Sequence, residues 1–134
     1  MQYGVSWAKF ESMGTREIAE AVCRMPSEFY ERRNISMLGL LKESGYLQDP
    51  DAVTEEELER VFRSFPDLID GWVRICDEPN RYHWILQPPA ATSDSSDWVV
   101  IYPNERKYDL YSEGAKACAF VTKKKIERYR SIIG

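Results

Sequence analysis

The chain has 134 residues, of which 43% are hydrophobic and 30% are charged. A chain of this length and composition can bury a substantial hydrophobic core, which excludes an intrinsically disordered or fibrous protein. No stretch approaches the roughly 18 apolar residues of a membrane span, and the first residues lack the pattern of a signal peptide. We therefore expect one domain over residues 1–134, in the cytoplasm and with no membrane partner.

The formal net charge of −4 is unevenly distributed along the chain. Residues 41–70 contain nine acidic and three basic side chains, whereas residues 71–134 contain eight acidic and ten basic ones. Nucleic-acid-binding domains usually have a concentrated basic face, and only the three consecutive lysines at 123–125 approach one. We therefore expect no nucleic-acid partner.

The first half of the chain has the apolar spacing and the end signals of short helices. Thr15 is expected to cap a helix over residues 15–24, and Pro26 is expected to end it. A further helix over residues 37–44 is predicted to begin after a serine cap and to end at Gly45, where a left-handed backbone is favoured.

A capping box of Thr54 and Glu57 predicts a helix that runs to about Ser64. The residues expected on its buried side are Leu58, Val61, Phe62 and Phe65. Pro66 suits the first turn of the helix that follows, so the two helices are expected to meet at a corner.

From residue 81 onward, apolar and polar residues alternate as in strands that bury one face. The predicted strands are residues 81–87, 98–102 and 107–111. Short connections predict an antiparallel meander, and a last helix is expected over residues 113–132 after a cap at Ser112. The predicted fold class is α+β, with N-terminal helices packed on a small antiparallel β-meander and a C-terminal helix.

No residue pattern predicts a catalytic, metal or cofactor site. The single histidine, His83, is expected to be a partly buried strand residue rather than a catalytic base. The three cysteines, Cys23, Cys76 and Cys118, are widely spaced and predict free, buried thiols in a reducing compartment. The chain has neither zinc-ligand spacing nor a glycine-rich phosphate loop, so we expect no metal and no cofactor.

Aromatic residues are frequent in the predicted strands, where some are expected to face away from the helices. They are Tyr82, Trp84, Trp98, Tyr102, Tyr108 and Tyr111. Trp and Tyr are common at the energetic centre of protein interfaces, so the set predicts an aromatic patch on the open sheet face. Core packing remains the better explanation for any one of them.

Several segments resemble a group of small bacterial proteins. They are SMLGLLKESGY at 36–46, VTEE at 53–56, FPDLIDGW at 65–72, RYHW at 81–84 and ACAF at 117–120. Such proteins resemble the immunity proteins of polymorphic-toxin and contact-dependent growth inhibition systems. The resemblance implies a non-catalytic protein that binds and neutralises one cognate toxin domain in the cytoplasm, as a tight one-to-one complex.

An acidic surface would attract a basic nuclease toxin by long-range steering, so the charge distribution agrees with that implication. The predicted partner-binding residues are Glu55, Glu56, Glu59, Asp67 and Asp70 as acidic contacts, with Trp98 as the aromatic centre. A plain solvated helix face is the alternative explanation of the carboxylates. Two other functions stay open: a small hydrolase that uses carboxylates and His83, and a homo-oligomeric scaffold or adaptor with a self-complementary aromatic sheet face.

Overall fold

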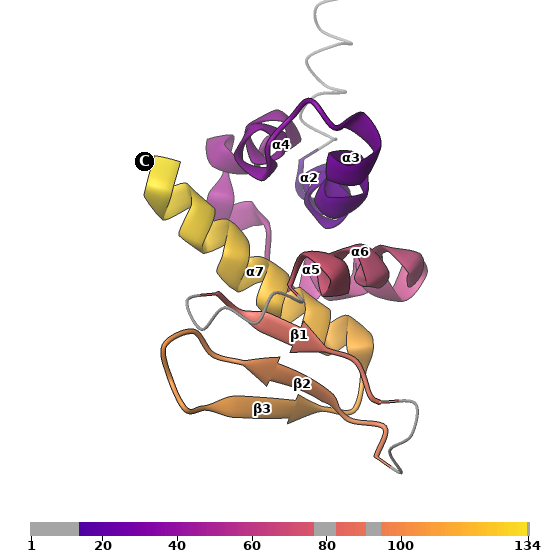
Figure 1. Cartoon of the computed structure of the whole chain (residues 1–134). Helices are drawn as coiled ribbons and strands as arrows, with labels where there is room; N and C mark the ends of the chain where they lie inside the picture. Colours follow the sequence, from indigo (N-terminus) through magenta and orange to yellow (C-terminus); the bar gives the residue numbers. More distant parts are fainter. Residues whose placement is uncertain (1–13, 77–82, 91–94, 134) are drawn as a thin grey trace, which may run out of the picture.

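The computed structural model describes residues 14–76, 83–90 and 95–133. Its helices and strands, in chain order, are α2 (Thr15–Cys23), α3 (Met25–Arg32), α4 (Met37–Ser44), the 3-10 turns η1 (Tyr46–Gln48) and η2 (Pro50–Ala52), α5 (Glu55–Ser64), α6 (Asp67–Ile75), β1 (Ile85–Gln87), β2 (Trp98–Ile101), β3 (Tyr108–Tyr111) and α7 (Gly114–Ile133). The strands form one antiparallel sheet in the order β1-β2-β3 (Figure 1). The predicted α+β class, with the meander between the first helices and the last one, is confirmed.

Side-chain caps set the ends of α4 and α5 as the sequence predicts. The hydroxyl oxygen of Ser36 accepts a hydrogen bond from the Gly39 amide at 3.0 Å, and Gly45 closes α4 with a φ of 89°. The hydroxyl oxygen of Thr54 accepts from the Glu57 amide at 3.2 Å and opens α5. Only this half of the predicted capping box forms, since the Glu57 carboxylate accepts from Arg60 at 2.8 Å instead of from the Thr54 amide. These bonds join residues close in sequence, so neighbouring residues are sufficient to specify them.

The predicted cap of the first helix was wrong, and its predicted end was right only in part. Gly14 occupies the cap position of α2, and Thr15 is its first helical residue, with no side-chain cap hydrogen bond. The first helix does end just before Pro26, at Cys23, but helical structure resumes at Met25, so that Pro26 lies in the first turn of α3. Proline is tolerated there because the amides of a first turn have no partner within the helix. Met25 and Pro26 are both buried, so the first turn of α3 packs into the core, whereas Glu31 and Arg32 at its end are exposed.

Phe65 was expected on the buried side of α5, but the residue is 41% exposed. The helix ends at Ser64, and Phe65 has a non-helical backbone with φ −131° and ψ 73°. Because Phe65 is not helical, its side chain does not continue the buried apolar face formed by Leu58, Val61 and Phe62. The guanidinium group of Arg24 lies 5.6 Å from the centre of its ring.

The C-terminal helix α7 joins the two halves of the domain. It packs most extensively along α5, also contacts α4 and α6, and meets all three strands. In Figure 1 it crosses behind the sheet, and the other helices lie mainly above the strands. Its buried residues are Ala115, Ala117, Cys118, Ala119, Val121, Thr122, Lys125 and Ile126. The N-terminal helices therefore reach the sheet mainly through α7, with α6 also touching β1.

Among the described residues, Trp72 on α6 is the largest fully buried side chain. Its indole N–H donates a hydrogen bond to the carbonyl oxygen of Cys23 at 2.9 Å, at the end of α2. A buried indole is stable in a core when its single donor is satisfied in this way. The bond links two helices that are 49 residues apart in the chain.

Candidate partner-binding surfaces

One face of the sheet is turned away from α7. In the antiparallel register, Ile85 pairs with Ile101, which pairs with Tyr108. In a second cross-strand row, two residues further along each strand, Gln87 pairs with Val99, which pairs with Leu110. Directly paired residues share a face of the sheet, so all six side chains lie together. Tyr108 is 63% exposed and Leu110 is 57% exposed. We call this set of six residues the open sheet face.

The other face of the sheet packs on α7 and holds most of the strand aromatics. Leu86 and Val100, which pair with one another, are fully buried there. Around Phe120 of α7 are the rings of Trp84, Tyr102 and Tyr111, with centroids 5.5, 6.1 and 6.2 Å from its own. The open face is therefore mainly aliphatic rather than aromatic, because Tyr108 is its one aromatic residue among the described residues; Tyr82 lies outside them.

Trp98, the predicted aromatic anchor, lies on the covered face. It pairs with Tyr111, is partly buried, and packs against the hydrophobic core. A Cβ atom built on Gly114 would lie 2.6 Å from Cζ2 of its indole ring, so the ring rests directly on the first residue of α7. Trp98 is therefore placed to hold the sheet on α7, and Leu110 and Tyr108 are the large apolar side chains that β3 exposes.

Gly114→Ala is expected to lower the free energy of unfolding by about 1–3 kcal/mol, because the added methyl group must displace the Trp98 ring. Helix propensity alone predicts the opposite change, because alanine is more favourable than glycine in a helix by about 1 kcal/mol. Urea denaturation measures the change. In a Trp98→Ala background the same substitution should become neutral or stabilising, and an equal loss in both backgrounds would contradict this contact.

The structure separates the predicted acidic contacts into two groups. Glu55 and Glu56 are exposed in the first turn of α5, and Asp67 and Asp70 are exposed in the first turn of α6. Residues 57–64 of α5 and the turn into α6 lie between the two groups, and these eight helical residues span about 12 Å. The structure therefore has two groups of carboxylates, at the starts of two different helices, rather than one cluster. Each group lies at a helix N-terminus, where carboxylates are favourable for the helix itself.

Glu59 is engaged within the chain. Its carboxylate accepts from Arg63 at 2.6 Å, and the same guanidinium group donates to Glu113 at 2.8 Å. The hydrogen bond and charge of Arg63 lower the pKa of Glu113. Arg63 therefore links α5 to the start of α7, and Glu59 is the least available of the predicted acidic contacts.

His83 is exposed and precedes β1, so the expectation of a partly buried strand residue was wrong. Strand pairing begins only at Ile85, which leaves His83 outside the ladder. It borders a cavity for which the described lining residues include no carboxylate. The structure therefore does not bring His83 next to the acidic residues of α5 and α6.

The cysteines are free and buried, as predicted. Burial raises the pKa of all three thiols, that of Cys76 to about 11. They are therefore neutral near pH 7, and a thiolate nucleophile is not favoured at any of them. Across residues 14–76, 83–90 and 95–133, no three His, Cys, Asp or Glu side chains form a group that could hold a metal ion.

The three lysines at the middle of α7 do not form one basic face. The ammonium group of Lys123 donates to the carbonyl oxygen of Val53 at 2.5 Å. That of Lys124 lies 5.5 Å from the ring centre of Phe120, and Lys125 is only 7% exposed. Successive helical residues point about 100° apart, which sends each lysine to a different environment.

No protein-family model, curated protein or solved structure matches the chain. Within the part of the chain that the structure describes, no helix combines the length and the apolar character that crossing a membrane requires.

Proposed function

We propose that the chain is a non-catalytic, cytoplasmic binding protein that neutralises a cognate bacterial toxin domain in a one-to-one complex. The open sheet face is the observation that supports a binding role. The class of partner is supported by the sequence segments that resemble immunity proteins, and the location by three free, buried thiols.

The open sheet face has the chemistry of an interaction surface. Its two cross-strand rows contain five apolar or aromatic side chains and one glutamine. Contiguous exposed apolar surface is uncommon on monomeric proteins and marks binding sites when it occurs. β3 is also an edge strand, so a partner that covers Tyr108 and Leu110 can pair with its free backbone groups as well.

The charge at the start of α5 acts on a side chain of the same strand. The pKa of Tyr111, the last residue of β3, is raised by burial and further by the charges of Asp109 and Glu55. The charge of Glu55 therefore acts on the phenol of Tyr111, which lies on the covered face of the sheet next to the edge of the open one. Glu55 and Glu56 would steer a basic toxin domain toward this strand, whereas Asp67 and Asp70 lie beyond the other end of α5.

Co-expression with the product of the adjacent upstream gene tests the proposal. A bacterial host that the toxin domain kills should survive when this chain is co-expressed, and the purified pair should form a one-to-one complex whose association slows as salt rises. Survival without a stable complex, or no protection from the toxin domain, would contradict it.

Charge reversal should show which carboxylates steer the partner. Glu55→Lys with Glu56→Lys is expected to slow association about tenfold at low salt, and to change it much less at high salt. Asp67→Lys with Asp70→Lys is the matched control, because it makes the same change in net charge at the N-terminus of another helix. Stopped-flow mixing measures both rates. Equal slowing in the two variants would mean that net charge alone, and not the start of α5, directs association.

A further inference from the structure

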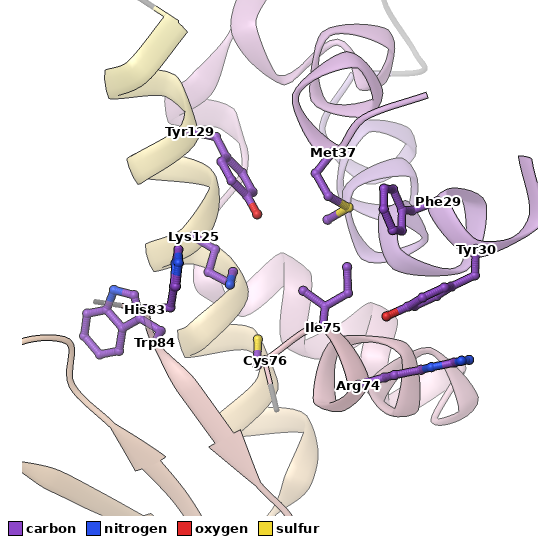
Figure 2. Close-up of a pocket in the computed structure, with 10 residues that line it drawn as sticks. All are labelled: Phe29, Tyr30, Met37, Arg74, Ile75, Cys76, His83, Trp84, Lys125 and Tyr129. Atoms are coloured by element: carbon purple, nitrogen blue, oxygen red, sulfur yellow. The ribbon is translucent and has the colours of Figure 1, made fainter. Parts of the chain in front are cut away.

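A cavity of about 270 Å³ lies between α7 and the helices α3, α4 and α6, away from the open sheet face. Its walls are largely apolar or aromatic, with Phe29, Met37, Ile75 and Trp84 among the lining residues. Figure 2 shows Lys125 and Tyr129 directing an ammonium group and a hydroxyl group from α7 into this space. The volume is near the lower end of ligand pockets, about 300 Å³, which limits an occupant to a small molecule or one side chain.

Lys125 is the unusual member of the lining. The residue is 7% exposed, and no hydrogen bond or ion pair within the described ranges uses its ammonium group. The described residues that line the cavity include no carboxylate. Among the described residues no fully buried side-chain nitrogen or oxygen lacks a hydrogen-bond partner, so solvent in the cavity reaches this ammonium group. An anion that enters the cavity takes the place of that solvent and forms a charge-assisted hydrogen bond.

The Cys76 thiol and the Tyr129 phenol, which line the cavity with Lys125, do not supply a negative charge. Burial raises the pKa of Cys76 to about 11, and the positive charge of Lys125 lowers it only in part. Burial also raises the pKa of Tyr129. Both groups are therefore neutral near pH 7. The Tyr129 hydroxyl, one helical turn from Lys125, remains available to donate a hydrogen bond to an anion.

We infer that this cavity is a binding site for a carboxylate attached to a small apolar body. The carboxylate pairs with Lys125 and accepts a hydrogen bond from Tyr129, and the apolar body lies against Ile75, Met37 and Phe29. The other cation in the lining, Arg74, has its guanidinium group 4.2 Å from the centre of the Tyr30 ring, so it is already engaged by an aromatic face. The apolar walls around Lys125 favour a monoanion with an apolar body over a strongly hydrated phosphate. A free organic acid and an acidic side chain of a bound protein present the same group.

NMR titration of the full chain tests the inference, with sodium benzoate as the probe and benzamide as its uncharged counterpart. Benzoate should shift the signals of residues lining the cavity to saturation, whereas benzamide should bind at least tenfold more weakly. Lys125→Met should weaken benzoate binding at least tenfold, and Lys124→Met should leave it unchanged. A capped tripeptide with a central aspartate distinguishes a free organic acid from an acidic side chain of a bound protein. If the tripeptide binds more tightly than benzoate, and Lys125→Met weakens that binding, the site is assigned to a protein side chain.

Two further measurements keep the test independent of folding. Lys125→Met keeps a chain of similar length, so its melting temperature should equal or exceed that of the native protein. Tyr129→Phe, which removes only the hydroxyl group, should weaken benzoate binding less than Lys125→Met does. Equal binding of benzoate and benzamide, no binding of either anionic probe, or native binding by Lys125→Met would each overturn the assignment.

Discussion

Trp72→Ala is expected to lower the free energy of unfolding by about 3–5 kcal/mol, the usual range for truncating a fully buried tryptophan. The substitution leaves a large cavity where α6 meets α2, and it also leaves the carbonyl oxygen of Cys23 without its indole donor. Small domains are stable by only about 5–15 kcal/mol, so a large part of the stability is lost. Urea denaturation followed by circular dichroism measures the change.

Two variants separate the causes of this loss. Trp72→Phe keeps an aromatic ring but removes the donor, and the unpaired buried carbonyl alone should cost about 1–3 kcal/mol. Ile132→Ala, at a site 64% exposed on α7, should change stability by less than about 0.5 kcal/mol. A loss at Trp72→Ala no larger than that at Ile132→Ala would mean that Trp72 does not hold α6 on the core.

Leu110→Asp should weaken the complex with the toxin domain by about 30-fold or more, as expected for a residue at the centre of an interface. The new carboxylate would attract a basic partner, so a loss of affinity despite that attraction identifies lost apolar contact as the cause. Leu110 is 57% exposed, and the fold should tolerate the change. Isothermal titration calorimetry measures the affinity, and circular dichroism verifies the fold.

Ile132→Asp is the matched control for Leu110→Asp. It places the same charge on an aliphatic residue of similar exposure, at the end of α7 rather than on the sheet. Its affinity for the toxin domain should equal that of the native chain. Light scattering tests the competing use of the open sheet face: a native dimer that Leu110→Asp dissociates would favour the self-complementary scaffold, and a monomer would oppose it.

Among the candidate site residues, the sequence identified the acidic residues but not their grouping. It placed Glu55, Glu56, Asp67 and Asp70 on helix surfaces, where the structure has them. The length of α5, together with the turn into α6, separates them into two groups. Glu59 could not be distinguished from its neighbours, because its partner Arg63 also binds Glu113, 50 residues away in the chain.

For the sheet residues, too, the sequence predicts which side chains share a face but not which face is buried. Alternation from residue 107 to 111 predicts that Tyr108 and Leu110 share one face and that Asp109 and Tyr111 share the other. It does not show which face a helix covers. Packing of α7 decided this, and it placed Trp98 against Gly114 while leaving Leu110 exposed.

The sequence by itself determined the α+β class, the caps at Ser36 and Thr54, the left-handed turn at Gly45 and the free state of the cysteines. Each cap and turn depends on hydrogen bonds or backbone preferences within a few residues, and the free thiols follow from cysteine number and spacing. The tertiary structure alone decided which sheet face is open and which of three consecutive lysines is buried. Those outcomes depend on helices brought together from distant parts of the chain, because burial is a property of the packed core rather than of any local segment.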